Sequence, residues 1–299
     1  MILEIMLPFY GRVDHFRAAV ESVLAQDDPG WTLTIVDDVY PDPEPQKWAE
    51  SLGDPRITYL RNEINLGPSK NYLKCVSLMT GEYSVLFGCD DVMLPDYVTR
   101  VKELLSEFPG ASVIQPGVQV IDENGTPYLP LVDRIKDHYR FRGTGSRQYS
   151  GEEIAVSLLR GNWTYFPSLL WRVELLRRYG FHQDLDVVQD FVMLLDIAAG
   201  GGSLVLDDRV VFQYRRHQGS VSSAAAVDGS RFRQERELFD GQASRFDAIG
   251  WSRAARTARR HWSSKLNALT RLPLAIRQGD GRGVRALLTH AVGGHIRDE

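Results

Sequence analysis

The chain has 299 residues, and its 43% hydrophobic and 25% charged residues are ordinary for a globular protein with one large domain and an appendage. No apolar run reaches membrane-spanning length, and the first residues do not form a basic region followed by an apolar signal core. The two cysteines, Cys75 and Cys89, do not make a disulfide framework. We therefore expect a cytoplasmic protein in a reducing compartment.

The net charge of −4 conceals an asymmetry between the two ends of the chain. From Trp251 to Glu299 there are ten Lys or Arg against three Asp or Glu, whereas the first 250 residues carry 25 positive and 36 negative side chains. A basic, amphipathic tail suits peripheral contact with the inner face of a membrane, or a homo-oligomer interface. Packing back onto the domain is the alternative, and no nucleic-acid-reading motif is present, so we expect no nucleic acid partner.

Strands and helices alternate over the first ~110 residues, which predicts an α/β fold with a parallel sheet. The expected elements in chain order are a strand at Ile2–Leu7, a helix after Asp14, a strand at Trp31–Val36, a helix at Gln46–Leu52, a strand at Ile57–Leu60, a helix after Pro68, a strand at Tyr83–Phe87 and a helix after Asp96.

The second half of the chain has a mixed pattern. Strands are expected at 112–115, 118–121, 204–206 and 210–214, and helices at 152–159, 173–179 and 188–199. Residues 126–150 are polar and rich in Gly, Pro and charge, so we expect a long loop or lid. Beyond residue 222 the pattern is helical, at roughly 230–248, 252–272 and 283–292.

Two acidic pairs, Asp37-Asp38 and Asp90-Asp91, follow two of the expected strands directly. The carboxyl ends of parallel strands share one sheet edge, where ligands bind in open α/β folds. Carboxylates gathered there suit Mg²⁺ or Mn²⁺ together with phosphate oxygens, although solvated loop acids or helix caps are the plain alternative. Arg12, Arg61 and Lys70 could reach a phosphate or could be surface charges.

No Walker-type loop and no Gly-x-Gly-x-x-Gly follows the first strand, which disfavours kinases, NTPases and dinucleotide enzymes. Several runs instead resemble the family 2 glycosyltransferases of GT-A fold, in the same order. These runs are Leu7-Pro8-Phe9-Tyr10-Gly11-Arg12, Ser22-Val23-Leu24-Ala25-Gln26, Trp31 to Asp38, Asn65-Leu66-Gly67-Pro68-Ser69-Lys70-Asn71 and Gly81 to Asp96.

The resemblance covers roughly residues 1–220 and implies a GT-A, Rossmann-like mixed and mainly parallel sheet flanked by helices. It implies a glycosyltransferase domain over 1–222, with a nucleotide-sugar half at 1–110 and an acceptor half at 111–222, followed by a helical C-terminal extension over 223–299. The implied activity is inverting transfer of a sugar from a UDP-, dTDP- or GDP-linked donor to a hydroxyl acceptor. That acceptor could belong to a surface polysaccharide, a lipid-linked sugar or a natural product.

The same resemblance implies roles for individual residues. The nucleotide-sugar site would contain Pro8, Tyr10, Arg12, Asp37, Asp38, Asn65, Gly67, Lys70 and Asp90. Asp91 would bind Mg²⁺ or Mn²⁺ with Asp90, helped by His217 in the segment Tyr214-Arg215-Arg216-His217. Two positions depart from the family, because Gly88 stands where Asp-x-Asp-Asp begins and Tyr40 stands where Ser is frequent.

An inverting transfer needs a base for the acceptor hydroxyl, and the family places an Asp in an acidic pair at a helix start. Here that position is Asp190 after Gln189; a simple helix cap is the alternative, and Asp184 and Asp186 are further candidates. Arg215 and Arg216 are expected at the diphosphate, and Trp163 and Tyr165 at the acceptor, where core packing is equally plausible.

Gly88 and Gln189 also fit a different class of protein, a catalytically silent sugar-nucleotide-binding or scaffold protein of the same fold. A nucleotidyltransferase is a third possibility, since it too uses an α/β sheet and acidic metal ligands. It would release pyrophosphate, and the chain lacks the Gly-rich basic loop expected for it after the first strand.

Overall fold

The computed structural model describes residues 1–141, 143–180, 189–216, 230–277 and 281–292. Within this part of the chain, nine strands form one mixed sheet in the order β3-β2-β1-β4-β8-β6-β9-β5, with β7 paired to β9. The strands are β1 (Leu3–Phe9), β2 (Trp31–Asp37), β3 (Ile57–Arg61), β4 (Tyr83–Leu86), β5 (Val92–Met93), β6 (Val113–Ile121), β7 (Arg147–Ser150), β8 (Leu170–Arg172) and β9 (Ser203–Arg215).

The first four strands are parallel to one another, and β6 is parallel to β9. Strand β8 runs antiparallel between β4 and β6 and so joins the two parallel groups. The predicted α/β sheet is therefore confirmed.

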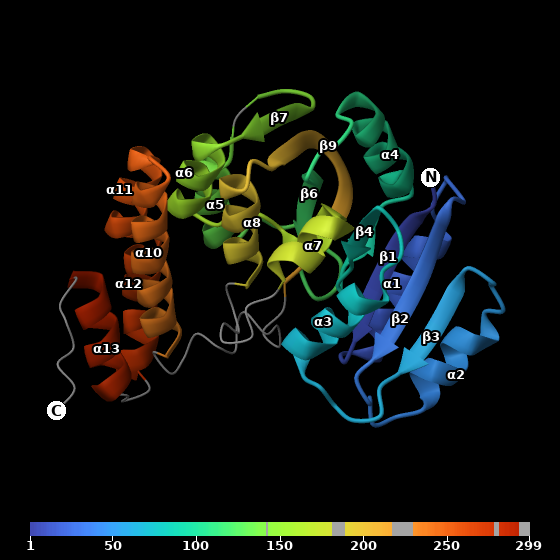
Figure 1. The fold of residues 1–299 in the computed structure, drawn as a ribbon. Helices are drawn as coiled ribbons and strands as arrows, with labels where there is room; N and C mark the ends of the chain where they lie inside the picture. The colour runs from blue at the N-terminus through green and yellow to red at the C-terminus, as the bar shows by residue number, and fades with distance from the viewer. Residues whose placement is uncertain (142, 181–188, 217–229, 278–280, 293–299) are drawn as a thin grey trace.

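Helices cover both faces of the sheet (Figure 1). They are α1 (Val13–Leu24), α2 (Glu44–Ser51), α3 (Pro68–Leu78), α4 (Tyr97–Glu107), α5 (Leu131–Tyr139), α6 (Glu152–Arg160), the 3-10 turn η1 (Phe166–Ser168), α7 (Val173–Tyr179), α8 (Gln189–Ala199), α10 (Ser230–Ala248), α11 (Ser252–Arg260), α12 (Trp262–Arg277) and α13 (Gly281–Val292).

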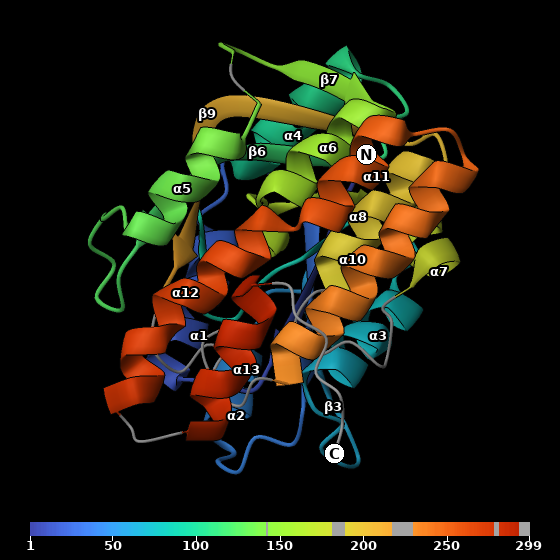
Figure 2. The ribbon, with the colours of Figure 1, turned by 90° about the vertical axis from the view of Figure 1, so that its left-hand side faces the viewer.

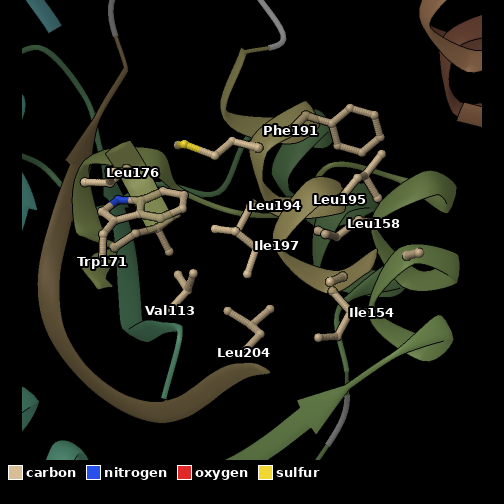
Figure 3. Close-up of a cluster of buried hydrophobic side chains, with 14 of the residues drawn as sticks. Val113, Ile154, Leu158, Trp171, Leu176, Phe191, Leu194, Leu195, Ile197 and Leu204 are labelled. Carbon is tan, nitrogen blue, oxygen red and sulfur yellow. The ribbon is translucent and has the colours of Figure 1, made fainter. Parts of the chain in front are cut away.

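Alternation along the strands divides the core into two clusters. In β1, Leu3, Ile5, Leu7 and Phe9 pack with α1, α2 and α4, whereas Met6 points to the opposite face. Helices α3, α6, α7 and α8 cover that second face. Figure 3 shows part of its cluster, where Val113 and Trp171 of the sheet lie opposite Leu194 and Ile197 of α8.

The C-terminal helices are joined to this second cluster. Phe239 and Phe246 of α10 are buried in it, as are Ala254, Ala255 and Ala258 of α11. Helices α12 and α13 pack mainly on each other, around Ala268 and Leu287. Together α10–α13 form one side of the molecule, which faces the viewer in Figure 2.

Some expectations are wrong in detail. The predicted loop over 126–150 contains α5 and β7, and β6 and β9 each run without a break where two strands were expected. The single helix expected over 252–272 is two helices, because His261 adopts a left-handed conformation with φ 30° between α11 and α12. Helix α5 lies in the stretch that was predicted as a loop from its composition, and its buried Asp133 forms an ion pair with Arg216.

Among the helices of the described residues, none is both long enough and apolar enough to cross a bilayer. The boundary expected between residues 222 and 223 lies outside the described residues.

Candidate functional site

The two acidic pairs lie at one edge of the sheet, because parallel strands bring their carboxyl ends together. Phe9 at the end of β1 is paired with Asp37, and Met6 is paired with Leu86 at the end of β4. Residues 8–12, 37–38 and 87–91 therefore follow three adjacent strands at the same edge. The predicted convergence of these segments is confirmed by this register.

Asp37 and Asp38 build the loop that lies beside this edge. The Asp38 carboxylate accepts hydrogen bonds from the backbone N–H groups of Leu66 (2.7 Å) and Gly67 (2.8 Å) and from Asn62 Nδ2 (2.9 Å). Asp37 forms an ion pair with Arg61 and accepts a bond from the backbone N–H of Tyr40 (2.7 Å). Both carboxylates are buried, so direct contact with a base stays a prediction.

The same loop fixes two other predicted residues. Asn65 Nδ2 donates to the carbonyl oxygen of Asp38 (2.8 Å), and Gly67, with φ +77°, begins α3. A positive φ at this point favours glycine over any residue with a Cβ. Lys70 is exposed in the first turn of α3.

Residues after β1 leave side chains at the surface near this edge. The Tyr10 ring is 57% exposed and packs edge-on against Tyr40, with 5.8 Å between ring centroids. Arg12 is exposed and forms an ion pair with Asp14, with 2.5 Å between Nη2 and Oδ2. Pro8 is half-buried within β1. The exposed aromatic ring could stack on a nucleotide base, and the exposed cations beside it could pair with the phosphates.

Asp91 is the most unusual carboxylate of this edge. It is 1% exposed, its Oδ1 accepts a hydrogen bond from the backbone N–H of Arg215 (2.8 Å), and its Oδ2 has no hydrogen-bond partner among the described residues. Burial, and then the neighbouring Asp90, raise the pKa of Asp91 well above its usual range. A buried, unpartnered carboxylate oxygen is costly unless a cation or a proton balances it.

Gly88 makes room for this arrangement. A Cβ at residue 88 would stand 2.4 Å from Asp91 Oδ2 and 3.1 Å from Asp90 Oδ1, so both carboxylates converge on the space that its missing side chain leaves. Glycine at position 88, where the family often has Asp, thus leaves the space in which the two carboxylates meet.

These carboxylates fit a hard divalent cation. Two carboxylate oxygens that converge on one point, one of them buried and unpartnered, are the kind of ligands that Mg²⁺ or Mn²⁺ takes together with phosphates and water. The described residues contain no cluster of three or more His, Cys, Asp or Glu around one point. His217, the expected third ligand, lies outside the described residues.

The two arginines expected at the diphosphate have protein partners in the structure, and their contact with a diphosphate stays a prediction. Arg215 is buried, and its guanidinium donates to the carbonyl oxygens of Asp90 (2.7 Å), Asp122 (3.1 Å) and Glu123 (3.2 Å). It therefore joins the acidic loop to the turn after β6. Arg216 forms an ion pair with the buried Asp133 of α5, with 2.6 Å between Nε and Oδ2.

The two aromatic residues expected at the acceptor differ from each other. Trp163 is 1% exposed in the core and its indole N–H donates to Ser157 Oγ (3.1 Å), so the prediction that it stacks on a sugar is wrong. Tyr165 is half-buried, donates to Asp133 Oδ1 (3.1 Å) and packs against Tyr214 at 5.2 Å.

Asp190 lies in the first turn of α8, where the helix dipole favours a negative charge. Gln189 beside it donates from Nε2 to Ser69 Oγ of α3 (2.8 Å). The start of α8 is therefore tied to the first turn of α3, which follows the loop that Asp38 organises. Asp184 and Asp186 lie outside the described residues.

Several residues of this edge were not predicted from the sequence. Asp133 was missed because its partner Arg216 lies far along the chain. Tyr214 appeared in a quoted segment without a role, and it packs against Tyr165. Tyr72 of α3 is close enough to the acidic loop that Asp90 and Asp91, after burial and Cys89, raise its phenol pKa. Asn71 appeared in a quoted motif, and its buried side chain links Asn62 (3.0 Å) to the carbonyl oxygen of Val36 (3.0 Å).

Comparisons with solved structures show the fold. The chain resembles S. aureus TarS 1–349, solved in complex with UDP-GlcNAc, with a TM-score of 0.64 at 14% identity, covering 100% of this chain and 94% of that one. It also resembles the mannosyltransferase PcManGT from Pyrobaculum calidifontis, in complex with GDP-Man and Mn²⁺, with a TM-score of 0.60 at 17% identity, covering 97% and 79%.

Two curated relatives are similar in sequence. The succinoglycan biosynthesis protein ExoO of Rhizobium meliloti (strain 1021) is 23% identical over 232 residues, and the abequosyltransferase RfbV of Salmonella typhimurium (strain LT2) is 31% identical over 110 residues. These matches cover 73% and 35% of this chain, but only 62% and 33% of the two relatives.

The model of the family described as "Glycosyl transferase family 2" matches residues 4–171, which is more than half of the chain. The match includes both acidic pairs and the loop between them. The chain therefore belongs to glycosyl transferase family 2, with a fold of GT-A type.

Proposed function

We propose that the protein is an inverting transferase that moves a sugar from a nucleotide-diphosphate donor to a hydroxyl acceptor, with Mg²⁺ or Mn²⁺. One observation carries the proposal: the buried Asp91 Oδ2 has no partner among the described residues and converges with Asp90 at the ligand-binding edge. The nucleotide sugars bound to the two solved neighbours, and the Mn²⁺ bound to one of them, support it.

Asp90 and Asp91 would hold the cation, with His217 as a third ligand. When bound, the cation stabilises the diphosphate as a leaving group by offsetting its charge. The backbone N–H of Arg215 fixes Asp91, and its guanidinium fixes the carbonyl oxygen of Asp90. These contacts hold the Asp91 carboxylate and the backbone of Asp90 in place before a donor binds.

The donor nucleotide would lie against residues that follow β1 and β2. Tyr10 offers an exposed ring for the base, and Pro8, Asn65 and Gly67 shape the loop beside it. Arg12 and Lys70 are exposed cations that phosphate could reach, although Arg12 would have to release Asp14. Asp37 and Asp38 would contribute to base recognition by holding this loop.

Asp190 would act as the base. Its carboxylate takes the proton of the acceptor hydroxyl while that oxygen attacks the anomeric carbon and the bond to the diphosphate oxygen breaks. The Gln189–Ser69 contact ties the first turn of α8 to the first turn of α3, which supports a position of Asp190 near the donor site. Tyr165 would line the acceptor side.

The test is a screen of UDP-, dTDP- and GDP-sugars with Mn²⁺, by thermal shift and then by release of the nucleoside diphosphate. Asp91→Asn should remove the Mn²⁺-dependent part of donor binding, and Asp190→Asn should lower transfer about 100-fold or more while donor binding persists. Glu174→Gln is the matched control, because Glu174 is an exposed acid in the first turn of another helix, α7.

Each alternative predicts a different result. Turnover like that of the wild type in Asp190→Asn would remove that residue as the base. Donor binding without turnover on polysaccharide, lipid-linked and small-molecule acceptors would support the catalytically silent binder. Release of pyrophosphate from a nucleoside triphosphate would support a nucleotidyltransferase.

A further inference from the structure

A shallow groove of about 170 Å³ lies between α6 and α11, on the side of the molecule formed by the C-terminal helices (Figure 2). Four arginines line it, together with one apolar and one hydroxyl side chain. The lining residues are Val156, Arg160, Arg253, Arg256, Thr257 and Arg260.

The sequence of α11 explains why the arginines gather there. Ala254, Ala255 and Ala258 are buried against the core, which turns Arg253, Arg256 and Arg260 outward on the helix. Their spacing of three and four residues places them on one face. Arg160, at the end of α6, meets them from the other wall of the groove.

This charge is not balanced by nearby acids. None of the four arginines forms an ion pair with a carboxylate among the described residues, whereas Arg259, on the same helix, pairs with Asp247. Glu152 is the nearby acid, and its Oε1 accepts from the backbone N–H groups of Arg253 (2.7 Å) and Ala254 (3.0 Å). Guanidinium groups that converge without carboxylates form a site for phosphate.

The helix that follows adds an exposed apolar row. Trp262, Leu269 and Ile276 of α12 are 62%, 45% and 64% exposed, and their spacing of seven residues keeps them along one stripe. Trp262 comes two residues after Arg260, and Lys265 lies 5.9 Å from its ring centroid. Aromatic and apolar side chains next to cations are typical of helices that lie in a membrane interface.

We propose that α11 and α12 dock the protein on an anionic bilayer, with lipid phosphate groups in the arginine groove and the α12 row in the interface. A soluble phosphate would fill the groove but would leave Trp262, Leu269 and Ile276 in water, which favours the bilayer as the occupant. The inference is independent of the transfer reaction. It places the bilayer at the end of the molecule that α10–α13 form, opposite the end that carries β3 (Figure 1).

Co-sedimentation of the full chain with vesicles tests this docking. Vesicles of phosphatidylglycerol and phosphatidylcholine should bind the protein, and vesicles of phosphatidylcholine alone should not. Each cation near an anionic surface contributes about 1 kcal/mol, roughly a factor of five in affinity. The double variant Arg256→Gln/Arg260→Gln should therefore weaken binding about 30-fold. Trp262→Ala should weaken it in addition, and 0.5 M salt should weaken the wild type because salt screens charge.

The matched control is Arg209→Gln/Arg259→Gln, which removes the same charge from two exposed, ion-paired arginines, one of them on α11. An equal loss in this control would overturn the groove as the site. Phosphatidylcholine carries a phosphate but no net charge, so equal binding to both vesicle types would overturn the requirement for an anionic surface. Thermal stabilisation by inorganic phosphate, lost in Arg256→Gln/Arg260→Gln, with no vesicle binding by the wild type, would identify a soluble phosphate site and overturn the bilayer.

Discussion

At the scale of single residues, Asp38 is a buried carboxylate that organises the loop over residues 62–67. Three donors from residues 62–67 converge on its two oxygens, and the side chain is buried. Asp38 therefore fixes the loop over residues 62–67, which would face a nucleotide, from its buried side. A buried carboxylate with several donors contributes more to folding than an exposed one.

Replacement of Asp38 by Asn tests this role. The new amide would set a donor against the N–H groups of Leu66 or Gly67, so we expect a loss of about 2–3 kcal/mol of unfolding free energy. Urea denaturation followed by circular dichroism would measure it. Asp42→Asn is the control, because Asp42 is exposed and accepts a hydrogen bond from the backbone N–H of Glu44; an equal loss there would contradict the role of Asp38.

At the scale of elements, Gly117 lets β6 and β9 remain paired along their length. The ladder between them shifts register on both sides of Gly117, and a Cβ there would stand 2.5 Å from the carbonyl oxygen of Arg209. Only a residue without a side chain permits this approach of two backbones. The strand that ends at Arg215, beside the acidic pair, depends on it.

Gly117→Ala should therefore destabilise the protein by about 2 kcal/mol or more, because backbone atoms cannot yield as a flexible side chain can. Gly241→Ala in α10 is the matched substitution, since nothing lies within 4 Å of its Cβ position. For Gly241→Ala we expect the free energy of unfolding to rise by up to about 1 kcal/mol, because alanine has a higher helix propensity than glycine. Thermal unfolding of both variants would measure the contrast, and a neutral Gly117→Ala would show that the ladder can relax.

At the scale of the whole molecule, the C-terminal helices belong partly to the apolar core beside the sheet and partly to a separate layer. Helices α10 and α11 bury apolar side chains in the same cluster as α6 and α8, whereas α12 and α13 have a small cluster of their own. The division at residue 222 that the sequence predicts thus crosses a continuous apolar core, and it stays a prediction.

Truncation separates these two layers. A chain of residues 1–222 would expose the surface that Phe239, Phe246 and the alanines of α11 cover, so we expect it to aggregate or to unfold without cooperativity. A chain of residues 1–261 keeps those contacts and should unfold cooperatively. Calorimetry of both chains is the measurement, and a cooperative transition of 1–222 near that of the full chain would support the predicted boundary.

What the sequence predicted well was local. Strand ends, helix starts and the two acidic pairs follow from runs of a few residues, and the sheet edge follows from parallel connections. What it missed depends on contacts distant in sequence: Asp133 is buried because it meets Arg216, and Arg215 is occupied because three carbonyl oxygens converge on it. Burial of Trp163 likewise depends on helices that pack around it, which a single aromatic position does not reveal.

The space at Gly88 has a consequence for how this site can evolve. An aspartate introduced there would meet the Asp91 carboxylate within 2.4 Å of its own Cβ, so it could not act as an additional ligand while Asp91 keeps its present orientation. Positions 88 and 91 are therefore coupled, because a third acid at residue 88 requires a shift of the Asp91 side chain.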